Sequence, residues 1–191
     1  PDVYMYSSAI ASCTKQGKWR EALNLLNEMK ILGPDPDVYC YSAAINVLGK
    51  SMQWEKALDC LFSMKNNGIE PNEYAFGAAM TAVARTAKWE EALQLMDFIQ
   101  KSNQKVKPNR HIYNSCITAC SRAGKIDRVA YLFEDMKKNE ILPDVITYGS
   151  LIAALGNSGS DNHEKVLETM KEMKSKNIKP DLICFSSAIH S

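Results

Sequence analysis

Basic side chains recur at one regular step along the chain. Lys15, Lys50, Arg85 and Arg122 follow one another at intervals of 35, 35 and 37 residues, and Asn157 occupies the next such position. If the chain repeats in space as it does in sequence, these cations form a line whose spacing suits the phosphates of an extended strand. A cation at a helix end also complements the dipole of its own helix, and a solvated surface position is a third explanation. The regular spacing favours binding of a polyanion.

The overall charge argues against a general affinity for nucleic acid. Lys and Arg number 23 against 22 Asp and Glu, which leaves a net charge of +1. Any binding of a polyanion must therefore depend on where the cations lie. Because the chain contains no run of about 18 apolar residues, we expect no membrane span. Its first residues also lack the charged and apolar pattern of a signal peptide. The opening Pro1-Asp2 copies a later motif, so we expect further residues to precede it.

Six cysteines and three histidines offer little support for a metal site or for catalysis. No Cys-x-x-Cys pair is present, although Cys116 and Cys120 lie four residues apart and could supply half a site. We expect these two to be small buried residues, and free thiols suggest a reducing compartment. His111, His163 and His190 are scattered, with no recurring carboxylate cluster. We therefore expect no metal, no cofactor and no catalytic residue in this chain.

An internal repeat explains the regular step. Pro-Asp or Pro-Asn pairs recur along the chain and divide it into units of 35 or 37 residues. The units are residues 3–37, 38–72, 73–109, 110–144 and 145–181, with residues 182–191 as a truncated sixth. Each unit contains two helical patterns with apolar residues at i, i+3, i+4 and i+7. Those of the second unit are Tyr41, Ala44, Ile45 and Leu48, then Trp54, Ala57, Leu58 and Leu61.

A single hairpin of this size cannot bury both apolar stripes, but stacked hairpins can. The sequence therefore predicts an all-α fold, an α-solenoid of helix-turn-helix repeats in which residues 1–191 form a single array. Tetratricopeptide repeats carry Trp early in their first helix, whereas here Trp54 opens the second. The units resemble the pentatricopeptide repeat (PPR) family in its plain form. The segments that carry the resemblance are Val38-Tyr39-Cys40-Tyr41-Ser42, Gly49-Lys50, Glu55-Lys56-Ala57-Leu58, Met64-Lys65, Asn67-Gly68-Ile69 and Pro71-Asn72.

The resemblance covers essentially the whole chain and implies a right-handed solenoid whose first helices line a concave face. Each repeat would recognise one base of single-stranded RNA there. The fifth and last residues of each unit would face the Watson–Crick edge of that base together. These pairs are Ser7 with Asp37, Ser42 with Asn72, Gly77 with Asn109, Asn114 with Asp144, and Gly149 with Asp181.

The chemistry of the last residue suggests which base is preferred. Asp accepts a hydrogen bond from the N–H of guanine or uracil, whereas the Asn amide donates to the bare nitrogen of adenine or cytosine. A small fifth residue leaves room for a purine, and Asn114 reaches toward a pyrimidine. We therefore predict the RNA sequence G-A-A-U-G, with the third and fifth bases weakly determined because Gly77 and Gly149 have no side chain. The same Asp and Asn residues also suit helix N-capping, and both roles could coexist.

Base stacking is predicted at the second residue of each unit, where flat or apolar side chains recur. They are Tyr4, Tyr39, Tyr74, His111 and Ile146. Stacking of a base on such a side chain is worth about 1–3 kcal/mol. Family members more often carry an aliphatic residue here, so the tyrosines depart from the pattern. Lateral packing between units is the alternative explanation.

Two other functions stay open, because fold alone does not determine function. The chain could be a protein-interaction scaffold, which its balanced charge favours. It could also be the RNA-binding arm of a larger nuclease whose catalytic domain lies outside this chain. The resemblance further implies action in the mitochondrion or chloroplast, in RNA processing, stabilisation or translation.

Overall fold

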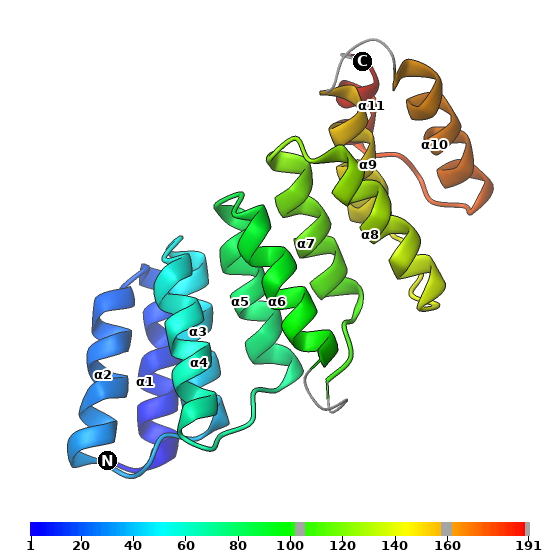
Figure 1. Ribbon diagram of the computed structural model, residues 1–191. Helices are drawn as coiled ribbons and strands as arrows, with labels where there is room; N and C mark the ends of the chain where they lie inside the picture. The colour runs from blue at the N-terminus through cyan, green and yellow to red at the C-terminus, as the bar shows by residue number, and fades with distance from the viewer. Residues whose placement is uncertain (102–105, 158–161, 190–191) are drawn as a thin grey trace. The chain divides into compact units, whose positions relative to one another are not determined.

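The computed structural model describes residues 1–101, 106–157 and 162–189, and within them all regular secondary structure is helical. Figure 1 shows the helices in chain order. They are α1 (Val3–Gln16), α2 (Trp19–Leu32), α3 (Val38–Lys50), α4 (Trp54–Asn66), α5 (Glu73–Arg85), α6 (Trp89–Lys101), α7 (Arg110–Arg122), α8 (Ile126–Lys138), α9 (Val145–Gly156), α10 (His163–Ser175) and α11 (Leu182–Ile189). The predicted pattern of two helices per repeat is confirmed. In the described ranges no helix has both the length and the apolar character needed to cross a bilayer.

An Asp or Asn side chain caps the start of every odd-numbered helix. In α3, for example, the Asp37 carboxylate accepts a hydrogen bond from the backbone N–H of Cys40 at 2.9 Å. Equivalent caps are formed by Asp2, Asn72, Asn109, Asp144 and Asp181. Such a cap typically stabilises a helix by about 1 kcal/mol, because it satisfies an N–H that has no partner within the helix. The Pro-Asp and Pro-Asn pairs therefore determine where these helices begin.

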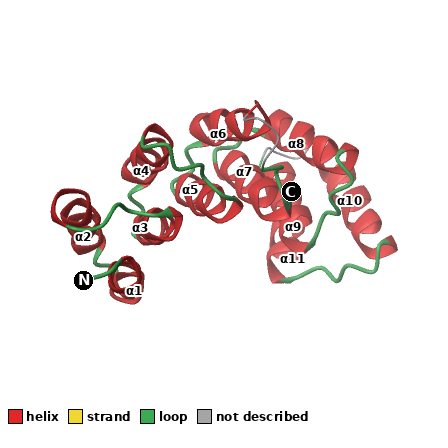
Figure 2. Ribbon diagram, turned by 90° about the horizontal axis from the view of Figure 1, so that it is seen from below, coloured by secondary structure: helices red, strands yellow, loops and turns green. Residues whose placement is uncertain are grey.

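The chain divides into two compact units, and each unit has two layers of helices. The first comprises Pro1–Thr86 with Phe98–Lys107, and the second comprises Ala87–Asp97 with Pro108–Ser191. In the first unit α3 packs between α1 and α5, with α2 and α4 in the other layer (Figure 2). In the second unit α9 packs between α7 and α11, with α8 and α10 in the other layer. Within each unit, the capped helices therefore stack directly on one another.

Buried tyrosines connect α3, α7 and α9 to the segments that follow them. The hydroxyl of Tyr41 accepts a hydrogen bond from Asn67 at 2.7 Å, and that of Tyr113 donates to Asp135 at 2.6 Å. Tyr148 donates to Glu172 at 3.0 Å, and burial followed by this bond to a carboxylate raises its pKa above the ordinary value. Because the rings are buried while their hydroxyls are paired, these bonds hold the two helices of a hairpin in one relative orientation.

Close approach of neighbouring capped helices depends on a glycine in the first unit. A Cβ atom at Gly49 would lie 3.1 Å from the carbonyl oxygen of Ala78 and 3.2 Å from Cβ of Ala82. Any larger residue would push α3 away from α5. Gly49 therefore helps to set the distance between side chains that α3 and α5 present on the same surface.

Candidate nucleic-acid interface

The last residue of each repeat is the N-cap of the next capped helix, so the capping explanation holds at all five positions. The cap uses one oxygen, Oδ1, as the acceptor of a backbone N–H. An Asn in this position can accept only through Oδ1, so its Nδ2 group is the end available to donate elsewhere. An Asp keeps a second carboxylate oxygen, which can only accept. Capping therefore determines that Asn72 presents a donor and that Asp37 presents an acceptor.

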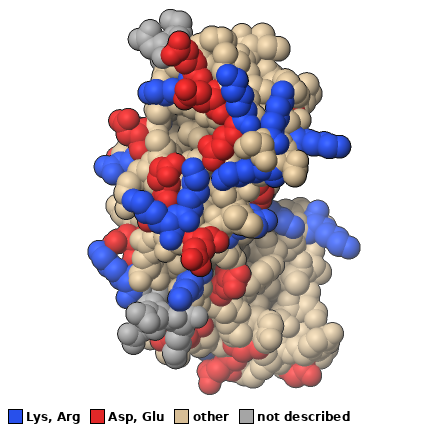
Figure 3. Space-filling model, turned by 90° about the vertical axis from the view of Figure 1, so that its right-hand side faces the viewer, with Lys and Arg blue, Asp and Glu red and all other residues tan. Residues whose placement is uncertain are grey.

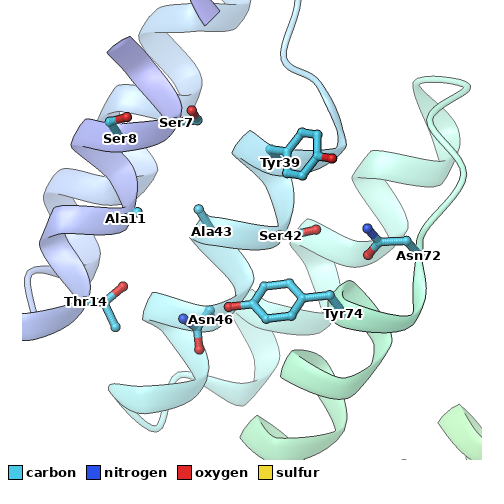
Figure 4. A pocket seen from close by; sticks show the side chains of 10 residues that line it. All are labelled: Ser7, Ser8, Ala11, Thr14, Tyr39, Ser42, Ala43, Asn46, Asn72 and Tyr74. Carbon is cyan, nitrogen blue, oxygen red and sulfur yellow. The ribbon is translucent and has the colours of Figure 1, made fainter. Parts of the chain in front are cut away.

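A pocket with a volume of about 310 Å³ lies against α1, α3 and the start of α5. In Figure 4 the Ser42 side chain lies between the rings of Tyr39 and Tyr74, and the amide of Asn72 points toward it. The remaining lining residues are Ser7, Ser8, Ala11, Thr14, Ala43 and Asn46. The structure thus brings the predicted base-recognition pair of the second repeat together with two predicted stacking residues.

Ser42 is 3% exposed, and its hydroxyl oxygen has no hydrogen-bond partner among the described residues. An unpaired buried hydroxyl costs about 1–3 kcal/mol. A ligand in the pocket that bonds to this hydroxyl would recover that cost. Its position between two aromatic rings and its unpaired hydroxyl make Ser42 a candidate contact for a ligand in this pocket.

The predicted stacking residues lie at the surface. Tyr39 and Tyr74 are 70% and 58% exposed, and Tyr4 and Ile146 are more than half exposed. His111 is also exposed. Such exposure is contrary to the alternative that these side chains pack between repeats, because packed side chains lose most of their accessible surface.

In the second unit the predicted pair of the fourth repeat is joined directly. Asn114 Nδ2 donates to both carboxylate oxygens of Asp144, at 3.0 and 3.1 Å. The amide oxygen of Asn114 accepts from the hydroxyl of Thr147 at 2.6 Å. Asn114 is 7% exposed, and Thr147 is fully buried. The two residues that the sequence pairs are therefore neighbours, and their orientations are held by a third residue.

The four basic residues occupy equivalent places on their helices. Lys15, Lys50, Arg85 and Arg122 lie in the last turns of α1, α3, α5 and α7, and all are exposed. Asn157 follows at the C-cap of α9. This placement is compatible both with phosphate binding and with the helix-dipole explanation. On the face drawn in Figure 3, Lys and Arg are interspersed with Asp and Glu, as the balanced charge leads one to expect.

The remaining predicted positions carry less chemistry. Gly77 and Gly149 are buried in α5 and α9, so within the predicted base-recognition pairs of those two repeats only the caps Asn109 and Asp181 have a side chain. Ser7 is half-buried, and its hydroxyl donates to the carbonyl of Tyr4 at 3.0 Å.

All six cysteines are buried free thiols. Burial was the prediction for Cys116 and Cys120. The pKa of Cys40 and that of Cys60 are raised to about 12, and burial is the largest cause in both. These thiols are therefore protonated at neutral pH. His111 and His163 are exposed, and His190 lies outside the described residues. No group of three metal-binding side chains gathers in the described part of the chain.

Two polar residues of these sites were missed by the sequence analysis. Asn46 lines the pocket one helical turn after Ser42, and the spacing i, i+4 could have found it. Thr147 lies three residues after Asp144, and the two form a capping box. That spacing is a known signal for a helix start, but it does not reveal the additional bond to Asn114.

Comparison with known proteins identifies the class. The model of the PPR repeat family matches residues 1–50, 36–85 and 108–157, and the model of the PPR repeat matches residues 146–178. Since these matches cover more than half of the chain, it belongs to the pentatricopeptide repeat family. No curated protein matches the chain.

Solved structures share the fold. PPR10 in complex with an 18-nucleotide psaJ RNA element matches 100% of this chain and 27% of its own, with a TM-score of 0.82 and 22% identity. PPR10 from maize matches 99% of this chain and 26% of its own, with a TM-score of 0.71 and 30% identity. The PPR domain of Arabidopsis thaliana protein-only RNase P 1, in complex with tRNA, matches 99% of this chain and 99% of its own, with a TM-score of 0.80 and 17% identity. The predicted α-solenoid fold class is confirmed, and the chain spans about a quarter of the PPR10 chains.

Proposed function

We propose that this chain binds single-stranded RNA and that each repeat recognises one base at the start of its first helix. The observation that carries the proposal is the pocket of the second repeat. It combines two exposed aromatic rings, a buried hydroxyl without a partner and an amide whose orientation is set by its capping role. A flat ligand with hydrogen-bonding groups along one edge matches all three features, and a nucleobase is such a ligand.

The cap chemistry explains how neighbouring repeats prefer different bases. Asn72 offers an N–H donor beside Ser42, which suits the bare N1 of adenine and opposes the N1–H of guanine. Asp37 and Asp144 offer an acceptor, which suits the N–H of guanine or uracil. The small side chains of Ser7 and Ser42 leave room for purines. The preferred RNA is therefore G-A-A-U-G from 5′ to 3′, with the third and fifth bases weakly selected.

Phosphate binding is proposed for Lys15, Lys50, Arg85 and Arg122, which are exposed at equivalent helix ends. They lie eight residues after the fifth position of their repeats, which corresponds to about 12 Å along a helix. Their charges thus lie at a different level of the helix from the groups that contact the bases. In this arrangement the cations bind the backbone while the caps select the base.

We extend the proposal to the whole protein, as an RNA-binding protein that acts in an organelle. The family supports a role in organellar RNA processing, stabilisation or translation, in the mitochondrion or chloroplast. Recovery of the protein only from the cytosolic fraction of its cells would contradict this location. The fold is shared with the PPR domain of a protein-only RNase P, so a catalytic domain elsewhere in the protein is compatible with the proposal.

A protein-interaction scaffold is the second candidate, and the balanced charge is the observation that favours it.

Fluorescence anisotropy with short labelled RNAs separates RNA binding from the scaffold function. The reverse complement of GAAUG keeps the second and fourth bases, so the better control is AGUAG, which has the same composition. We expect GAAUG to bind at least about tenfold more tightly, since several hydrogen bonds are lost in AGUAG. Raising salt from about 50 to about 200 mM should weaken binding about 50-fold if four phosphates are contacted.

Equal binding of GAAUG and AGUAG would contradict base recognition but leave a general affinity for RNA. An absence of binding to either strand at low salt would contradict RNA binding altogether and favour a protein partner.

A further inference from the structure

Three side chains from two stacked helices form a closed hydrogen-bond network in the fourth repeat. The Thr147 hydroxyl lies 2.6 Å from the amide oxygen of Asn114 and 3.0 Å from Asp144 Oδ1. It also accepts the backbone N–H of Asp144 at 3.0 Å. A hydroxyl has only one hydrogen to donate, and the shorter contact indicates that Asn114 receives it. Thr147 is therefore the donor that satisfies the amide oxygen of a side chain with little access to solvent.

The network permits only one orientation of the Asn114 amide. With Nδ2 toward Asp144, the amide donates to a carboxylate, and its oxygen meets a hydroxyl donor. Rotation of the amide by half a turn would place its oxygen against the Asp144 carboxylate, where two acceptors repel each other. Because Nδ2 carries two hydrogens, one can be shared by the carboxylate oxygens while the second remains for a base.

We propose that Thr147 is a positioning residue that makes the fourth repeat select uracil over cytosine. This inference rests on the proposed function. Uracil has a carbonyl oxygen at C4, which accepts from Asn114, and an N3–H, which donates to Asp144. Cytosine has an amino group at C4, which would face the Asn114 N–H donor. By holding the amide with its N–H group toward the base, Thr147 adds to the discrimination that Asp144 provides alone.

The other repeats provide an internal comparison. The residue equivalent to Thr147 is Cys40, Ala75, Ile112 or Cys184 beside the other four pairs. None of these side chains has a hydroxyl, and none of the other pairs has an amide at the fifth position. The hydroxyl therefore occurs only where an amide oxygen needs a donor.

The test is the ratio of the dissociation constants for GAACG and GAAUG, measured with the full chain and several variants. Thr147→Val removes the donor and should lower the preference for uracil about three- to tenfold, the effect expected for one hydrogen bond. Thr147→Ser keeps the hydroxyl and should keep the ratio within about twofold. Thr147→Cys supplies a side chain that this position already holds in two other repeats and should lie between them, so the test does not depend on how well the valine variant folds.

Two controls separate positioning from structural support. Ser121→Ala removes another buried hydroxyl bond between α7 and α9, from Ser121 to the carbonyl of Ser150 at 2.8 Å, and should leave the ratio unchanged. The preference for adenine over guanine at the second nucleotide should stay constant in every variant.

Uniformly weaker binding of Thr147→Val and Thr147→Cys, with an unchanged ratio at the fourth nucleotide, would overturn the inference while leaving the proposed function intact. A wild-type chain that shows no preference at any nucleotide would overturn both.

Discussion

Replacement of Lys15, Lys50, Arg85 and Arg122 together by glutamine is expected to lower the affinity for GAAUG about 10²- to 10³-fold at about 0.1 M salt. Each phosphate contact on a single strand contributes about 0.7 to the slope of log affinity against log salt, so four contacts contribute about 3. The variant should therefore also lose most of its salt dependence. Anisotropy titrations at several salt concentrations measure both effects. All four side chains are exposed, so the substitutions leave the core intact.

A matched control uses four cations in the last turns of α2, α4, α6 and α8. These are Lys30, Lys65, Lys101 and Lys138. Their replacement by glutamine changes the net charge by the same four units. We expect this control to bind RNA within a few-fold of the wild type, since long-range effects of exposed charges are screened by salt. Equal losses in both variants would show that overall charge, rather than position, governs the affinity. Lower thermal stability with unchanged affinity in the first variant would support the helix-dipole explanation instead.

Exchange of Asn114→Thr together with Asp144→Asn is expected to change the preferred fourth base from uracil to adenine. Asn at this position can still cap α9 through its oxygen, as Asn72 caps α5, and would then present Nδ2 to the bare N1 of adenine. The shorter threonine leaves room for the larger purine. We expect the ratio of affinities for adenine and uracil to change by at least about tenfold, since the exchange alters the hydrogen-bonding groups that both residues offer to the base.

The second nucleotide is the internal control for this exchange, because Ser42 and Asn72 lie in the other compact unit. Titration of the double variant against GAAAG, GAAUG and GGAAG measures both positions. A preference for uracil that survives the exchange would contradict the pairing of fifth and last residues, although the fold would stand.

The helices and their starts are predictable from the sequence because local chemistry determines them. Apolar residues such as Tyr41, Ile45 and Leu48 recur with the period of one helical face, and all three are buried in α3. Asp37 and Asn72 follow proline and cap the next helix, which the sequence analysis had offered as an alternative to base recognition. The structure shows that capping takes place and that it determines which group of each side chain remains for a ligand.

The contacts between stacked helices are not predictable in the same way. The bond from Thr147 to Asn114 joins residues 33 positions apart and depends on the distance between α7 and α9. The unpaired hydroxyl of Ser42 likewise results from the packing of α3 against its neighbours. Spacing in the sequence indicates which residues share a helix face, but it does not give the separation of two helices or the hydrogen bonds across it.

The most direct test of base recognition by the capped helices concerns the second nucleotide, which is proposed to lie beside Ser42 and Asn72. Four RNAs that differ only in this nucleotide are titrated against the wild type and against Asn72→Asp, in which the carboxylate can still cap α5. We predict that the wild type binds adenine about tenfold more tightly than guanine and that the variant reverses this order. The same order of preference in both proteins would contradict recognition of the base by the capping residue.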